Sequence, residues 1–149
     1  GNANDAFHQT ASSPEGIGAL NAMQQALQTA GIAPSAVDYI NAHGTATENN
    51  DLSEGIGIQK LFGEHVPYFS STKPYTGHTL AAAGSIEAVY SMMALQHQMV
   101  WPNLNYVHQM PELRISPARD LVQDIPLKNI LSNSFGFGGN TSSLLIGSV

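Results

Sequence analysis

Helix-like and strand-like segments alternate along this chain, and the alternation limits its fold more than any other sequence feature. A helix is predicted after Ser13-Pro14, because serine caps helices, proline suits the first turn, and apolar residues then recur at helical spacing up to Gly31. Segment 37–42 is short and β-branched at intervals, so it predicts a strand. Such alternation is typical of α/β domains.

The alternation continues through the middle of the chain. Asn49 or Asn50 is expected to cap a second helix that ends at Gly63, and segment 66–70 predicts another strand. Segment 71–78 is a polar loop with turn-forming residues, and it leads into a third predicted helix over 80–98. We expect the inward face of that helix to carry Ile86, Val89, Tyr90, Met93 and His97.

The last part of the chain predicts a hairpin. Segment 102–126 contains four prolines and reads as an irregular connection. Segments 129–134 and 142–147 predict two strands, which the glycine-rich turn 135–140 joins.

Composition excludes several classes of function. Only 11% of the 149 residues are charged, against about 25% in typical proteins, which suggests a surface partly hidden in a larger body. The net charge of −6 disfavours nucleic acid and an anionic membrane as partners, and no apolar run is long enough to predict a membrane span. The absence of cysteine excludes disulfides, thiolate metal sites and a cysteine nucleophile within this chain.

The first candidate site segment is His43-Gly44-Thr45-Ala46-Thr47, directly after a predicted strand. Ligand sites in α/β sheets gather beyond the carboxyl ends of strands. The two threonines offer hydroxyl groups on one side of this segment. The alternative is a loop histidine that only hydrogen-bonds its neighbours, and the segment alone favours neither.

The second candidate segment runs from Lys73 to His78, with Glu87 nine residues further on. A cation close to an imidazole favours the neutral ring, which can then donate one hydrogen bond. Glu87 would neutralise the lysine. The alternative is a solvated lysine beside a helix-capping histidine.

The third candidate segment is 133–139, Asn-Ser-Phe-Gly-Phe-Gly-Gly, whose glycines can leave amide N–H groups free to face an anion. The alternative is an ordinary hairpin turn. A dinucleotide fingerprint fails here because Thr141 stands where the third glycine belongs. The chain also lacks the sequence patterns of a phosphate loop, a zinc protease or an α/β-hydrolase, and we expect no metal site.

Together these segments resemble the C-terminal half of elongating β-ketoacyl-[acyl-carrier-protein] synthases, which are thiolase-like condensing enzymes. The motifs stand in the order of that family and cover nearly the whole chain. They are segment 41–47 with Asp51 and Glu54 behind it, segment 70–78, segment 82–84 with Glu87, and segment 133–139. The resemblance implies an α/β fold of the thiolase-like class: the C-terminal half of a layered αβαβα architecture, with a mixed sheet and flanking helices over residues 1–149.

The implied reaction is a decarboxylative Claisen condensation of an acyl thioester with malonyl-acyl-carrier protein. By matched position, His43 and His78 are the catalytic histidines, whose N–H groups stabilise the enolate formed when carbon dioxide leaves. Lys73 holds the histidines, and Glu87 pairs with Lys73. Further implied roles are a gating and oxyanion function for Phe137 in the loop with Gly136 and Gly138, and contacts of Thr45 and Thr47 with the phosphopantetheine arm.

The resemblance also implies partners that this chain does not contain. These are the acyl-carrier protein, whose phosphopantetheine is a substrate arm and not a bound cofactor, an N-terminal half that supplies the nucleophilic cysteine, and a second copy in a cytoplasmic homodimer. We therefore expect a fragment that begins just after the first strand of its half and is inactive alone. A catalytically silent chain-length partner of a ketosynthase remains the alternative.

Three positions depart from the family pattern. Pro74-Tyr75 replaces a smaller or more flexible pair, and this change is expected to alter the shape of the pocket. Asn140-Thr141 stands in the opposite order to the usual Thr-Asn, which is expected to disturb hydrogen bonds of the oxyanion loop. Asn50 occupies a position where glycine is frequent.

Overall fold

The computed structural model describes residues 1–148 and contains one five-stranded sheet. Its strands are β1 (Asn2–Asn4), β2 (Tyr39–Asn41), β3 (Tyr68–Ser70), β4 (Asn129–Phe135) and β5 (Asn140–Gly147), in the spatial order β1-β5-β4-β2-β3. Strand β2 is parallel to β3 and β4, whereas β5 is antiparallel to β4 and β1. The predicted mixed sheet and the predicted β4–β5 hairpin are confirmed.

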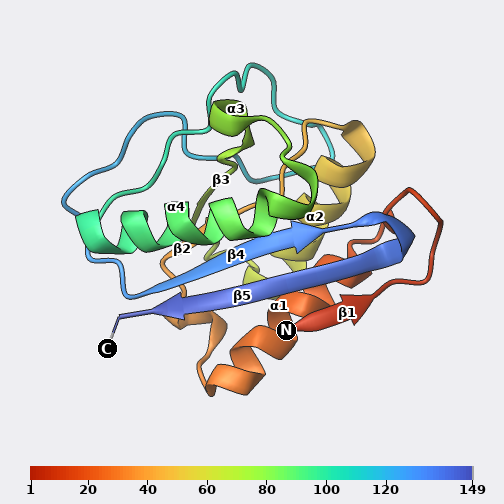
Figure 1. Ribbon diagram of the computed structural model, residues 1–149, viewed down its shortest axis with the longest axis horizontal. Coiled ribbons are helices and arrows are strands. Elements are labelled where there is room, and N and C mark those ends of the chain that lie inside the picture. Colours follow the sequence, from red (N-terminus) through yellow and green to blue (C-terminus); the bar gives the residue numbers. More distant parts are fainter. Residues whose placement is uncertain (149) are drawn as a thin grey trace.

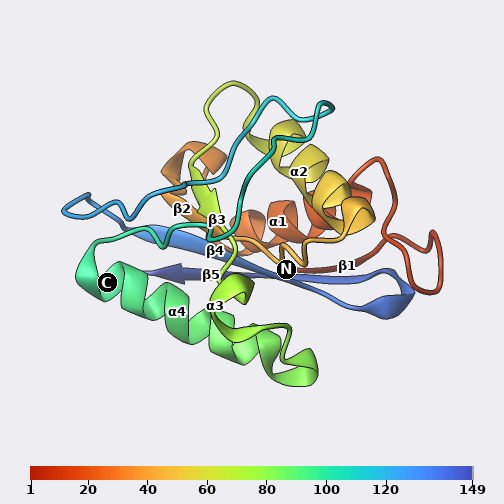
Figure 2. The same ribbon diagram turned by 90° about the horizontal axis from the view of Figure 1, so that it is seen from above.

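Helices cover both faces of this sheet (Figures 1 and 2). Helices α1 (Ile17–Ala30) and α2 (Glu48–Phe62) lie on one face, and α4 (Ala83–His97) lies on the other. The short helices lie in the connections: η1 (Pro34–Ala36), α3 (Lys73–Thr76), η2 (Leu80–Ala82) and η3 (Phe137–Gly139). Strand β2 is buried throughout, as expected for a central strand with both faces covered.

Small residues allow α1 and α2 to pack closely. A Cβ atom added to Gly57 would lie 2.9 Å from the Ala19 Cβ atom, so a larger residue at position 57 would push the helices apart. Beneath the two helices, Met23, Ile40 and Leu131 are fully buried and form part of the main apolar core. This core fixes α2 against the sheet and thereby fixes the side chains that α2 sends towards the loop after β2.

One strand was not predicted, and one helix cap was predicted wrongly. Residues 2–4 form β1, which pairs with residues 140–142 of β5. Asparagine and alanine have low strand propensity, so pairing with an open sheet edge decides their conformation. Thr47, and not Asn49 or Asn50, is the N-cap of α2. The Asn49 side chain instead exchanges two hydrogen bonds with the Ser12 backbone.

The predicted inward face of α4 is also wrong. The helix buries Ala83, Glu87, Ser91 and Ala94, while Val89 and Met93 are 48% and 40% exposed. Small residues face the sheet because α4 lies very close to β4: a Cβ atom on Gly84 would lie 2.9 Å from the Ser134 Oγ atom. The larger side chains of Val89, Met92 and Met93 are therefore left exposed on α4.

The remaining segments follow the prediction more closely. Residues 102–126 are irregular, apart from an isolated bridge between Val122 and Val100 at the entry to this connection. The predicted loop 71–78 contains a single helical turn, α3. Within residues 1–148, no helix is both long and apolar enough to cross a membrane.

Candidate active site

The candidate site lies at the carboxyl ends of three neighbouring parallel strands. His43 follows β2, Lys73 follows β3, and Ser134 lies near the end of β4. Because parallel strands end at the same edge of a sheet, residues that are far apart in the sequence meet there. The structure thus brings the first and second candidate segments together, as the sequence predicts.

A buried ammonium group organises this site. Lys73 is 6% exposed, and its Nζ group donates hydrogen bonds to the His43 carbonyl oxygen, the His43 Nδ1 atom and the Glu87 Oε1 atom. These three bonds use all three protons of the ammonium group. The other Glu87 oxygen, Oε2, accepts a hydrogen bond from the Ser134 hydroxyl at 3.0 Å. The buried ion pair is therefore well supplied with partners, which a charge inside a protein requires.

Both imidazole rings are held in one tautomer. An ammonium group has no acceptor, so the His43 Nδ1 atom, 3.1 Å from Lys73 Nζ, must be the acceptor. The His78 Nδ1 atom likewise accepts the Leu80 backbone N–H at 3.1 Å. In a neutral imidazole the other nitrogen then carries the proton. Each ring therefore presents an Nε2–H donor.

The two rings also lie side by side. Their centroids are 5.4 Å apart, with the ring planes nearly perpendicular at 88°. Phe135 packs against the other side of His43 at 5.3 Å between centroids. His43 is 4% exposed, whereas His78 is exposed. The pair thus offers two N–H donors at the border between a buried network and a surface that a substrate can reach.

The surroundings of His43 keep its ring uncharged. Burial, then the Lys73 charge, then His78 lower the pKa of His43 from 6.5 to about 3. A neutral ring is the form that donates one hydrogen bond and accepts another, as the geometry requires. Burial also raises the pKa of Glu87, and the hydrogen bond and charge of Lys73 oppose that rise.

The low pKa of His43 gives a direct prediction. Its ring should show no titration between pH 5 and pH 8, whereas an ordinary histidine titrates near 6.5. The same shift makes the unfolded chain bind a proton that the folded chain does not bind between about pH 6.5 and pH 3. The contribution of His43 to stability is therefore complete above pH 6.5 and falls as the pH is lowered through that window. Histidine ring ¹⁵N chemical shifts across this range test the prediction, and an inflection near pH 6.5 assigned to His43 would contradict it.

Glu54 is a site residue whose role the sequence did not reveal. It is 3% exposed, and its two oxygens accept the His43 and Gly44 backbone N–H groups, each at 2.9 Å. The Asn133 side-chain amide donates a third hydrogen bond at 3.0 Å. Glu54 thus fixes the loop that carries His43. An acidic residue on the inner side of a helix was the available signal, but the identity of its partners depends on the tertiary structure.

The threonines lie beside a cavity of about 590 Å³. The Thr45 and Thr47 hydroxyls are 2.9 Å apart, as the sequence suggested, and Thr45 lines the cavity together with Lys73 and His78. The opposite wall comes from the irregular segment 103–117. His78 therefore lines a cavity whose other wall is largely apolar.

The glycine-rich turn is already engaged in internal hydrogen bonds. The Gly136 N–H donates to the Asn140 carbonyl oxygen at 2.8 Å, and the Gly138 N–H donates to the Gln9 carbonyl oxygen at 2.7 Å. Phe137 is 78% exposed in this turn. Of the amides discussed for the oxyanion loop, this leaves the Phe137 N–H as the candidate donor. The reversed Asn140-Thr141 pair supports the turn, because the Asn140 amide donates to the Phe137 carbonyl oxygen at 3.1 Å.

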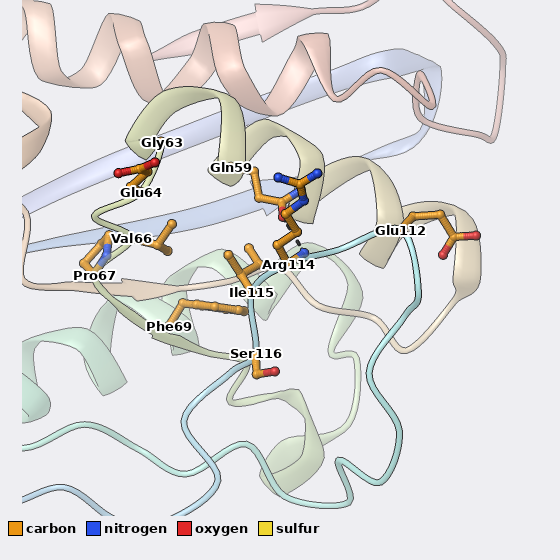
Figure 3. Close-up of a pocket in the computed structure, with 10 residues that line it drawn as sticks. All are labelled: Gln59, Gly63, Glu64, Val66, Pro67, Phe69, Glu112, Arg114, Ile115 and Ser116. Carbon is orange, nitrogen blue, oxygen red and sulfur yellow. Dashed lines mark hydrogen bonds between the residues drawn. The ribbon is translucent and has the colours of Figure 1, made fainter.

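A second cavity, of about 720 Å³, lies near the end of α2 (Figure 3). Its lining includes Gln59, Glu64, Phe69, Glu112 and Arg114. None of the site residues predicted from the sequence lines it. We therefore place the candidate active site at the histidine pair.

Comparison with known proteins points to one family. The sequence model of the family described as "Beta-ketoacyl synthase, C-terminal domain" matches residues 1–107. The chain is 42% identical over 147 residues to 3-oxoacyl-[acyl-carrier-protein] synthase 2 of Staphylococcus aureus (strain COL), and 39% identical over 151 residues to the protein of the same name from Coxiella burnetii. These alignments cover 97% and 100% of this chain but 36% of each relative. The chain thus spans about a third of the length of these relatives.

Solved structures agree with the sequence relatives. The ketosynthase ApeO, in complex with its chain length factor ApeC from Xenorhabdus doucetiae, is 40% identical with a TM-score of 0.92. A structure of AntDE:AntF, a type II PKS acyl-carrier protein in complex with its ketosynthase, is 34% identical with a TM-score of 0.94. The matches cover 100% and 99% of this chain, and 38% and 37% of those chains. The sheet order, the histidine pair with its lysine and these relatives agree: the chain belongs to the β-ketoacyl synthase family, matches its C-terminal domain and has a thiolase-like fold.

Proposed function

We propose that this chain is the malonyl-decarboxylating half of a condensing enzyme that extends acyl chains. The observation that carries the proposal is the pair of neighbouring imidazoles, each held with its Nε2–H free to donate. Loss of carbon dioxide from a malonyl thioester leaves its electron pair on the thioester enolate. Two N–H donors aimed at that oxygen stabilise the charge as it develops.

The complete reaction needs groups from outside this chain. In the proposed sequence, the acyl group is held on a cysteine of the N-terminal half. The enolate carbon attacks the acyl carbonyl, a carbon–carbon bond forms, the carbon–sulfur bond breaks, and the cysteine leaves as a thiolate. The Phe137 N–H is proposed to stabilise the oxyanion formed in this step, with Gly136 and Gly138 shaping the turn. Since the chain contains no cysteine, we expect it to be inactive alone.

The surface of α4 supports an N-terminal half as partner. Val89, Met92 and Met93 are between 40% and 51% exposed, and all lie on the one helix that covers this face of the sheet. Apolar residues in such a group favour a covering partner. The proposal therefore places the missing half against α4, and a homodimer in the cytoplasm remains a prediction.

The substrate arm is proposed to enter through the cavity that Thr45 lines. Its polar end contains Thr45 and His78, and Thr47 adds a second hydroxyl beside Thr45. Hydroxyl groups suit the amide groups of a phosphopantetheine arm, whose carrier protein is named in the structure of AntDE:AntF. The intact network of Lys73, His43 and His78 favours a catalytic half over the silent chain-length alternative.

Reconstitution tests this proposal. The full-length protein is incubated with an acyl thioester and malonyl-acyl-carrier protein, and the carrier-bound products are followed by mass spectrometry. We expect a product longer by two carbons with a β-keto group, and none from the 149-residue chain alone. If a full-length protein with an acylated cysteine gives no product, the proposed function is wrong. If the 149-residue chain alone gives product, the proposed dependence of the reaction on an N-terminal half is wrong.

A further inference from the structure

Segment 71–78, which contains Lys73 and His78, is also held by contacts other than the hydrogen bonds of Lys73 and the two histidines. The Asn103 Oδ1 atom accepts the Ser71 backbone N–H at 2.8 Å. The Tyr75 hydroxyl donates to the Pro102 carbonyl oxygen, also at 2.8 Å. Segment 101–103 therefore contacts this part of the site at two points, one before Lys73 and one after it.

The first point acts through Ser71. Its hydroxyl group donates to the Gly44 carbonyl oxygen at 3.0 Å, and the Ser71 Oγ atom accepts the Lys73 backbone N–H at 3.2 Å. Gly44 directly follows His43. By fixing the Ser71 backbone, Asn103 supports a residue whose hydroxyl group joins the His43 loop to the Lys73 turn.

The second point is an aromatic cluster. The Tyr75 ring lies 6.3 Å from the Tyr90 ring of α4 and 6.2 Å from the Trp101 ring, and those two rings are 5.2 Å apart. The Trp101 indole N–H donates to the Tyr90 carbonyl oxygen at 3.0 Å. The cluster thus fastens the α3 turn, through Tyr75, to α4 and to the segment that follows α4.

Segment 101–103 is itself firmly attached to the fold. The Asn103 N–H donates to the Ala118 carbonyl oxygen at 2.7 Å, and the Ala118 N–H donates to the Phe69 carbonyl oxygen of β3 at 2.8 Å. Just before this segment, Val100 is fully buried and pairs with Val122. These hydrogen bonds therefore connect Asn103, through Ala118, to strand β3 of the sheet.

The chain beyond Tyr75 has much weaker anchoring. Residues 75–78 are exposed, and within the described structure the hydrogen bonds of 76–80 are local, such as Gly77 N–H to the Lys73 carbonyl oxygen and Leu80 N–H to His78. We propose that Tyr75 and Asn103 are positioning residues that set the separation of the His43 and His78 imidazoles, an inference that rests on the proposed function.

Substitutions in the full-length protein test the inference. Tyr75→Ala should lower kcat for malonyl decarboxylation about tenfold to a hundredfold, because displacement by about 1 Å can cost that much. The Tyr75→Phe variant, which keeps the ring and loses one hydrogen bond, should lower kcat about fivefold. In the Tyr75 variants KM should change by less than about twofold and the rate of cysteine acylation should not change, since Tyr75 does not line the cavity proposed for the substrate arm.

Matched variants separate positioning from a general structural effect. In Asn103→Ala the kcat for malonyl decarboxylation should fall about fivefold, while Asn103→Asp keeps the acceptor for the Ser71 N–H and should lose less kcat than Asn103→Ala. Tyr68→Phe makes the same chemical change as Tyr75→Phe on the half-exposed start of β3, and should have no effect. Equal losses in decarboxylation and acylation, or no loss in Tyr75→Ala, would overturn the inference.

Failure of the proposed function gives a different result. If the acylated wild-type protein does not decarboxylate malonyl thioesters, the proposed function is wrong. Crystal structures of the wild type and the variants then test the inference in place of kinetics. The inference then requires the His43–His78 centroid distance to differ between the wild type and Tyr75→Ala, but not between the wild type and Tyr68→Phe. An unchanged distance of 5.4 Å in Tyr75→Ala would overturn it independently of activity.

Discussion

Replacing His43 or His78 with alanine in the full-length protein slows malonyl decarboxylation about 10²- to 10³-fold, the typical cost of removing one oxyanion donor. In the proposed reaction each ring supplies one Nε2–H to the developing enolate, so either loss removes half of the stabilising pair. Cysteine acylation precedes enolate formation and should change far less. Release of carbon dioxide and acylation by a radiolabelled acyl thioester measure the two steps separately.

Two further variants make this test specific. His78→Asn keeps a side-chain N–H donor, so it should lose less decarboxylation activity than His78→Ala. His65→Ala changes an exposed histidine that precedes β3 and should behave as the wild type. Equal losses in acylation and decarboxylation would show that the imidazole pair does not stabilise the enolate.

Replacing Lys73 with methionine is expected to produce the largest loss of stability. The substitution leaves the Glu87 carboxylate buried with Ser134 as its remaining partner, and such an uncompensated charge costs about 3–5 kcal/mol. Urea denaturation of the full-length protein measures the effect. The double variant Lys73→Met/Glu87→Gln should recover much of the loss, because a neutral amide replaces the unpaired charge.

The loss of stability in Lys73→Met should depend on pH in one direction. Burial already raises the pKa of Glu87, and loss of Lys73 removes the two largest of the interactions that oppose the rise, its hydrogen bond and its charge. A carboxyl group with a raised pKa in the folded state takes up its proton at a higher pH than in the unfolded chain. The destabilisation of Lys73→Met should therefore be greatest at alkaline pH and should shrink as the pH falls. A loss of stability that is constant from pH 8 to pH 5 would contradict this explanation.

Local patterns predicted most of the secondary structure but failed where packing decides. The first helix, the strands after residues 37 and 66 and the final hairpin follow from periodicity and turn residues. Strand β1 was missed because Asn2–Asn4 has no strand propensity of its own and forms by pairing with β5. The orientation of α4 was predicted wrongly because the rule that apolar residues face inward assumes that the core lies within this chain.

The candidate site shows the same division. The sequence identified His43, Lys73, His78 and Glu87 through the order of their motifs, and the structure brings these four together. The supporting role of Glu54 did not follow from the motif, because its partners lie on the loop after β2 and on β4. The roles of Phe137, Thr45 and Thr47 remain predictions.

The sequence by itself determined the family, the alternation of helices and strands, and which side chains are available for chemistry, since residue types and their order are local properties of the chain. Only the tertiary structure decided which Nδ1 atom accepts a hydrogen bond, and therefore which nitrogen of each ring carries the proton. It also decided that Lys73 is buried against Glu87 and that Tyr75 is fastened to Trp101. These properties depend on distances between distant segments, and the meeting of parallel strand ends at one sheet edge sets those distances.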